Sequence, residues 1–265
     1  MSHSHDDDTP HHGHRHGSAP DWIDCLRTAT AFLTRLPVSA RHGHDLARAT
    51  NAFPLVGAAV GLVAGLAYLL AWWLSLGPWL SAVAAVLAAI AVTGALHEDG
   101  LADVADGLGA RGEREGRLAA MRDSRIGAFG VIALVLALGA RVGGLAELHN
   151  PAAVILTLVA AGAISRAAVV VAMRYMPAAR SDGLGAGAGT PDMEEMLVAL
   201  AVAAVLAVAM LLPWGWLPAI LFGGGFAWII AWRARVAFGG QTGDVLGAIQ
   251  QMAEIGVICA AAAVT

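Results

Sequence analysis

Long apolar runs alternate with short polar segments over most of this 265-residue chain. From about residue 52 onwards most of the runs reach about 17–25 residues, which is long enough for an α-helix to cross the hydrocarbon core of a bilayer. They predict about seven spans, near residues 52–76, 79–96, 126–148, 152–176, 196–212, 216–232 and, more weakly, 246–265. We therefore expect an all-α fold, a polytopic transmembrane helical bundle.

The N-terminal region has a different pattern. Apolar residues of segment 21–38 alternate with Arg27 and Arg35, which is typical of an amphipathic helix lying in the membrane interface, here ending at Pro37. Residues 1–20 contain six His and three Asp. They predict a disordered tail, which either gathers metal ions or is a solvated terminus; we favour the solvated terminus, because no spacing specifies a closed metal site. Residues 21–265 are expected to form a single integral membrane catalytic domain.

The composition supports a membrane protein. The chain is 58% hydrophobic and only 14% charged, whereas soluble domains carry roughly 25% charged residues. Its net charge of −4 is small and has the wrong sign for a nucleic-acid-binding protein. We expect the lipid bilayer and small molecules as partners and no nucleic acid, and the sequence leaves a homo-oligomer open.

The arginines predict the orientation of the chain. All sixteen basic residues are Arg, and fourteen of them lie in the N-terminal region and in the connections 97–125, 174–195 and 233–245. The short connections near 77–78, 149–151 and 213–215 carry none. Alternating spans place every Arg-bearing connection on one side, which the positive-inside rule makes cytoplasmic. We expect an integral cytoplasmic (inner) membrane protein of a prokaryote, with its active site facing the cytoplasm.

Two arginines fall inside predicted spans. Charges within a membrane are costly and often functional. Arg141 can pair with Glu147 in a structural role or act in function, and both interpretations stay open. Arg166 has no obvious local partner, which favours a functional role. The weak last span carries Gln250, Gln251 and Glu254 and is expected to be partly buried against other helices.

The most informative segment is acidic and lies between two apolar runs, with the sequence HEDGLADVADG over residues 97–107. Asp99, Asp103 and Asp106 fall within an arc of about 60° on a helix that turns about 100° per residue. Carboxylates this close repel each other unless a cation lies between them. Carboxylate oxygens suit Mg²⁺, which also binds substrate phosphates. A solvated loop face is the alternative.

Two further segments carry polar groups on the same predicted side. Arg122, Asp123, Ser124 and Arg125 precede a helix expected to start near Ile126, and together they resemble an anion site at a helix N-terminus. Asp123 or Ser124 can instead be a simple N-cap. Residues 239–244 have the sequence GGQTGD, where Gly permits close approach of the backbone to a ligand and Gln241, Thr242 and Asp244 offer hydrogen bonds. An ordinary turn between helices is the alternative.

These residue types favour a metal-dependent phosphoryl-group transferase at a membrane surface. The segment 103–111 resembles the opening of the CDP-alcohol phosphotransferase motif, but Ala120 and Ser124 occupy positions where that family has Gly and Asp. A CDP-alcohol-type phosphotransferase is thus one alternative. A cobalt or nickel transporter with a His-rich tail is another, although transport sites normally lie at mid-membrane depth.

A more extensive resemblance covers the chain from about residue 25. Six ordered motifs resemble the cobalamin 5′-phosphate synthase (adenosylcobinamide-GDP ribazoletransferase) family: TRLPV at 34–38, FPLVG at 53–57, HxDGLADxxDG at 97–107, MRDSRIG at 121–127, SR at 165–166 and GQTGD at 240–244. The His-rich tail is not part of that pattern.

The resemblance implies the last assembly step of cobalamin biosynthesis. A hydroxyl of α-ribazole, or of its 5′-phosphate, attacks the corrinoid phosphate of adenosylcobinamide-GDP, and GMP leaves. The family uses Mg²⁺. We assign Asp99, Asp103, Asp106 and Asp123 to the metal and Asp99, Asp103 and His97 to catalysis. The residues assigned to substrate are Arg122, Ser124, Arg125, Arg166, Gln241, Thr242 and Asp244. His97 or Glu98 can be the general base, and Asp can serve as well.

Overall fold

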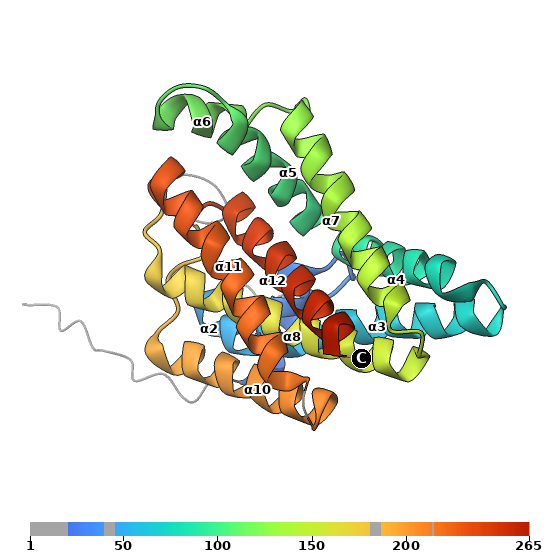
Figure 1. Cartoon of the computed structure of the whole chain (residues 1–265). Helices are drawn as coiled ribbons and strands as arrows, with labels where there is room; N and C mark the ends of the chain where they lie inside the picture. Colours follow the sequence, from blue (N-terminus) through green and yellow to red (C-terminus); the bar gives the residue numbers. More distant parts are fainter. Residues whose placement is uncertain (1–20, 40–45, 181–186, 214, 265) are drawn as a thin grey trace, which may run out of the picture.

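A computed structural model of the chain describes residues 21–39, 46–180, 187–213 and 215–264. The predicted disordered tail, residues 1–20, lies outside these residues. Figure 1 shows a bundle of helices. Their bounds are α1 Trp22–Leu33, α2 Leu46–Ala49, the 3₁₀ turn η1 Thr50–Ala52, α3 Phe53–Trp73, α4 Gly77–Thr93, α5 Leu96–Gly109, α6 Arg114–Ala120, α7 Ala128–Glu147, α8 Pro151–Tyr175, α10 Met193–Leu211, α11 Trp216–Phe238 and α12 Gly243–Val264.

The predicted all-α, polytopic architecture is confirmed. Among the described residues, six segments are long and apolar enough to cross a membrane: α3 with its preceding short helices, α7, α8, α10, α11 and α12. A seventh candidate, α4, passes only together with α5, and the two helices are bent by 92° at the break between them. Each predicted span therefore coincides with a helix, and the acidic segment lies on α5 just after this bend.

Glycine determines how closely the long helices pack. Gly57 and Gly61 of α3 face α8, where an added Cβ atom would overlap the carbonyl oxygens of Gly162 and Leu158. Small residues at a helix interface let two backbones approach and gain van der Waals contact in a membrane. The contact between α3 and α8 is the most extensive one between two helices in the bundle.

Helix α12 is the central element of the part of the bundle that positions the acidic helix. It packs against α11, α8, α5 and α7 (Figure 1). Most of its membrane-length window is buried inside the protein, which confirms that the polar last span lies against other helices. Because α12 contacts both α5 and α8, it connects the acidic segment to the interior of the bundle.

Candidate active site

The three acidic residues of α5 lie on one helix, as their spacing predicts. Asp99 is exposed and Asp103 is half-buried. The carboxylate of Asp103 is repelled by the charges of Asp99, Asp244 and Asp106, and Arg180 is the cation that opposes this repulsion. Negative charge is therefore concentrated around Asp103, and a cation or a proton there would relieve it.

Two motifs that are far apart in the sequence meet at this point. Gly100 of α5 packs against the first turn of α12, so that a Cβ atom at Gly100 would lie 2.7 Å from the carbonyl oxygen of Asp244. Farther along the same contact, Gly247 of α12 packs against the backbone of His97. Glycine is needed at position 100 because any side chain would push the acidic helix away from Asp244.

A short backbone bridge holds the loop before α12. The amide of Gln241 donates to the carbonyl of Pro177 at 2.8 Å, and the amide of Ala179 donates to the carbonyl of Gln241 at 2.8 Å. Gln241 and Thr242, both predicted to bind substrate, are buried in this bridge. The hydroxyl of Thr242 donates to Asp244 at 3.2 Å. The loop is therefore a rigid support for Asp244.

The bridge also brings in Arg180, whose role the sequence did not indicate. A guanidinium nitrogen of Arg180 lies 2.9 Å from a carboxylate oxygen of Asp244. Arg114 donates to the carbonyl of Ala179 at 2.7 Å. This hydrogen bond holds the residue that directly precedes Arg180. Arg180 thus connects the end of α8 to the acidic site, and only its place among the arginines of the 174–195 connection could have drawn attention to it.

Asp106 has a structural contact that the sequence did not indicate. Its two carboxylate oxygens accept hydrogen bonds from the backbone amides of Gly127 and Gly130, at 2.7 Å and 2.8 Å. These amides belong to the N-cap residue and the first turn of α7, which have no intrahelical partners for them. An N-cap by Asp123 or Ser124 was the alternative to an anion site in this segment; that alternative is wrong, because Asp106 provides the cap from α5.

The segment 122–125 is exposed. Asp123 and Arg125 form an ion pair of 2.9 Å with each other, and Asp123 also accepts the backbone amide of Arg125 at 3.0 Å. These hydrogen bonds from Arg125 lower the pKa of Asp123 from 3.8 to about 2. Arg122 and Ser124 lie in the same exposed segment. In this structure the carboxylate of Asp123 is thus directed to Arg125.

His97 lies in the interior. It is two residues before Asp99, or about 200° around the helix, so the two side chains leave α5 in opposite directions. Its side chain is buried and experiences the charges of Arg166, Glu254 and Arg141. If His97 takes part in catalysis as predicted, it acts from the buried side of α5, opposite the face that carries Asp99.

The two membrane arginines form a buried ionic network with partners from other helices. Arg141 lies 2.8 Å from Glu98 and 2.8 Å from Glu254, and Arg166 lies 2.9 Å from the other oxygen of Glu254. The predicted pairing of Arg141 with Glu147 is wrong, because Glu98 of α5 and Glu254 of α12 reach it across the bundle. Arg166, predicted to bind phosphate, has a carboxylate partner 88 residues away.

Gln250 and Gln251 complete this network. Gln251 donates to Glu98 at 3.0 Å, and Gln250 donates to Glu254 at 2.6 Å and to Ser165 at 3.2 Å. Two guanidinium groups and two carboxylates balance in charge, as ions buried in a membrane require. The sequence signals for this network were the two arginines inside predicted spans and the polar residues of an otherwise apolar last span.

The donor set of α5 is compatible with Mg²⁺. Among the residues that the structure describes, no three His, Cys, Asp or Glu side chains form a ready-made metal site. Mg²⁺, however, is usually held by one or two carboxylates together with substrate phosphates and water. Asp99 and Asp103, four residues apart on one face, offer such a pair. Asp106 and Asp123 were also predicted as metal ligands. In this structure Asp106 accepts hydrogen bonds from backbone amides, and Asp123 pairs with Arg125.

Comparisons with known proteins give a consistent result. Residues 25–262 match the model of the family described as cobalamin-5-phosphate synthase. A protein of Bradyrhizobium diazoefficiens named adenosylcobinamide-GDP ribazoletransferase is 45% identical over 241 residues, which cover 90% of this chain and 93% of the relative. A protein of the same name from Rhizobium etli is 41% identical over 253 residues, covering 91% of this chain and 96% of the relative. A search of solved structures found no match.

Proposed function

This chain belongs to the cobalamin-5-phosphate synthase family, and we propose that it joins adenosylcobinamide-GDP to α-ribazole or α-ribazole 5′-phosphate. The products are adenosylcobalamin, or its 5′-phosphate, and GMP. Membership of the family places the chain at the final assembly step of cobalamin biosynthesis. The contact between Gly100 and Asp244 supports the proposal best, because it joins two of the family-like motifs in one acidic site.

The proposed reaction is a substitution at phosphorus. A hydroxyl oxygen of α-ribazole forms a bond to the phosphorus atom attached to the corrinoid, and the bond from that phosphorus to the bridging oxygen breaks. GMP leaves with the bridging oxygen, and the hydroxyl proton passes to a base. Asp99 and Asp103 present carboxylates on the open face of α5, whereas His97 and Glu98 lie in the interior. We therefore favour an Asp as the base.

The substrate is a diphosphate, so the acidic helix needs a counter-charge. Asp99 and Asp103 would hold Mg²⁺, which would neutralise the diphosphate and stabilise the leaving phosphate. Arg122 and Arg125 are assigned to the phosphate groups, because a guanidinium donates two parallel hydrogen bonds to phosphate. Arg180 holds Asp244 beside Asp103 and so positions the polar wall of the site.

We place this site on the cytoplasmic side of the inner membrane. Helix α5, the loop before α7 and the loop before α12 all belong to Arg-bearing connections. The positive-inside rule assigns such connections to the cytoplasm. A cytoplasmic site would meet nucleotide-activated substrates where they are made, and the bilayer would accommodate the apolar helices.

Release of GMP tests the proposal. Purified protein in lipid nanodiscs is supplied with adenosylcobinamide-GDP and α-ribazole, first with EDTA and then with excess Mg²⁺. We expect GMP and a matching cobalamin product only with Mg²⁺. Corrinoid product in the presence of EDTA would overturn the metal requirement. Absence of corrinoid product in a folded sample, together with lipid product from a CDP-activated donor, would favour the phospholipid-forming alternative.

A further inference from the structure

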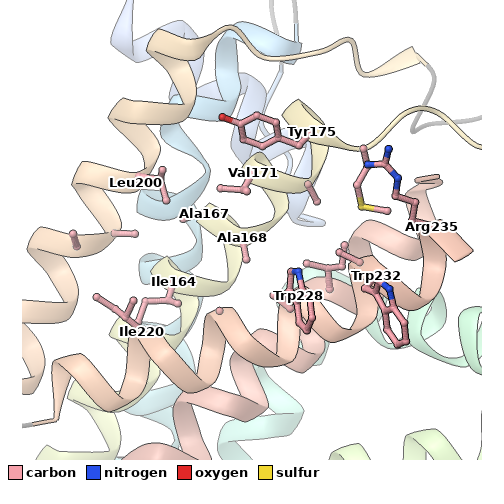
Figure 2. Close-up of a pocket in the computed structure, with 18 residues that line it drawn as sticks. Ile164, Ala167, Ala168, Val171, Tyr175, Leu200, Ile220, Trp228, Trp232 and Arg235 are labelled. Carbon is pink, nitrogen blue, oxygen red and sulfur yellow. The ribbon is translucent and has the colours of Figure 1, made fainter. Parts of the chain in front are cut away.

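An apolar groove lies between α8, α10 and α11, outside the acidic site. Its volume is about 660 Å³, within the range of roughly 300–1,000 Å³ that is typical of ligand-binding pockets. Figure 2 shows α8 residues such as Ala168 and Val171 along the groove, with Leu200 of α10 on one side and Trp228 of α11 on the other. The proposed reaction uses none of these side chains.

The groove is open on the outside of the bundle. Trp228 is 66% exposed and Leu200 is 39% exposed. Both residues lie on helices that are long and apolar enough to cross a membrane, so their exposed surface faces lipid. Lipid chains are the solvent of such a surface, so an apolar hollow in it is available to a lipid chain.

The length of the groove fits one leaflet. Along α8 and its C-cap it runs from Ile164 to Met176. These residues are twelve positions apart, or about 18 Å at 1.5 Å per residue. The hydrocarbon core of a bilayer is about 30 Å thick, so one leaflet accounts for about half of it. The groove can therefore hold an acyl chain that extends from the membrane surface towards the midplane.

The end of the groove at the membrane surface is cationic and aromatic. Tyr175, Trp232 and Arg235 lie there (Figure 2). Arg235 is exposed, and no carboxylate of the described residues forms an ion pair with it. Arg174 stacks over the ring of Tyr175 at 5.9 Å. Aromatic rings and arginines are typical of the headgroup region, and a guanidinium binds phosphate well.

We infer that this groove is a binding site for an anionic phospholipid. One acyl chain lies along α8 between α10 and α11, and the phosphate of the headgroup contacts Arg235. The site adjoins the support of the acidic site, because Met176 lines the groove and its carbonyl accepts a hydrogen bond from the side chain of Gln241 at 3.4 Å.

Two glycines of α11 offer a matched pair of variants. Gly224 lines the groove, whereas Gly225 does not. A Cβ atom at either position meets nothing within 4 Å, so Leu is tolerated at both and improves helix propensity equally. Gly224→Leu places a side chain in the groove, and Gly225→Leu places the same side chain outside it. A difference between the two variants therefore reports occupation of the groove.

The test is native mass spectrometry of the delipidated full chain with phosphatidylglycerol or phosphatidylcholine of identical acyl chains. We expect one phosphatidylglycerol to bind about 5-fold more tightly than phosphatidylcholine, because the choline cation of phosphatidylcholine offsets the phosphate charge that attracts Arg235. Gly224→Leu should abolish this binding and Gly225→Leu should retain it. Arg235→Gln should remove the headgroup preference, whereas Arg111→Gln, at an exposed position that does not line the groove, should keep it.

Two results would overturn the inference. Equal phosphatidylglycerol binding by the Gly224→Leu and Gly225→Leu variants would show that lipid does not occupy the groove. A headgroup preference that survives Arg235→Gln would show that the phosphate lies elsewhere. Neither readout depends on catalysis, so the lipid site and the proposed reaction can fail independently.

Discussion

The guanidinium of Arg141 on α7 lies 2.8 Å from the carboxylate of Glu98 on α5, and their side chains are only 2% and 9% exposed. Glu98 immediately precedes Asp99, so this ion pair anchors the first turn of the acidic helix to the interior of the bundle. The same Arg141 reaches Glu254 of α12. The network therefore holds α5, α7 and α12 in one arrangement beneath the site.

Loss of Arg141 is expected to destabilise the fold. Arg141→Met leaves Glu98 and part of Glu254 buried without a counter-charge, and breaking a buried ion pair in this way costs about 3–5 kcal/mol. Thermal unfolding in detergent micelles should show a clearly lowered midpoint. Arg111→Met, at an exposed position, is the control and should unfold like the unmodified chain. Equal midpoints for the two variants would contradict a structural role of the network.

The acidic residues of α5 are expected to have two different roles, and Asp99 and Asp103 are assigned to the metal. Asp99→Asn and Asp103→Asn keep the shape of the side chain but remove the charge that would hold Mg²⁺, so GMP release should fall by at least about 100-fold. Both variants should insert and unfold normally. Near-normal activity in both would reject the assignment of these two residues to the metal.

Asp106 is expected to behave differently because it caps α7. Asp106→Ala removes the acceptor for the amides of Gly127 and Gly130, and loss of such a cap costs about 1 kcal/mol. Asp106→Asn retains one oxygen acceptor and should lose less. The unfolding midpoints of the two variants measure the difference. If both unfold like the unmodified chain, the cap contributes nothing to stability.

The sequence predicted the parts of this protein that depend on local pattern. The apolar runs predicted the helices, and the spacing of Asp99, Asp103 and Asp106 predicted their common face. It did not predict partners brought together by packing, because Arg141 and Glu98 are 43 residues apart and Asp106 and Gly127 are 21 apart. Pairing within one helix was the obvious interpretation of Arg141, and the crossing of α5, α7 and α12 provided better partners.

Asp123 is expected to stay ionised in acid. Arg125 lowers its pKa from 3.8 to about 2, so the stabilising pair is present above pH 4 and is lost as the pH falls through about 2. In Arg125→Gln the pKa should rise part of the way back towards 3.8, because the guanidinium is lost while the backbone amide of residue 125 still donates to Asp123. Carbon-13 NMR of labelled aspartate carboxyls, assigned by the signal missing in Asp123→Asn, measures both values. An unchanged pKa in Arg125→Gln would refute the pairing.

Gly100→Ala is expected to separate the acidic helix from Asp244. The new Cβ atom would lie 2.7 Å from the carbonyl oxygen of Asp244, closer than van der Waals contact allows, and backbone must move to relieve the overlap. Overpacking of this kind costs about 1–3 kcal/mol.

The functional effect should exceed the loss of stability, because Asp103, Arg180 and Asp244 would no longer keep their relative positions. Gly139→Ala on α7 is the matched control: a Cβ atom there meets nothing within 4 Å, so activity should persist and helix stability should rise slightly. GMP release and unfolding are measured on both variants at one temperature. If Gly100→Ala keeps full activity, the close contact between α5 and α12 is not what positions the site.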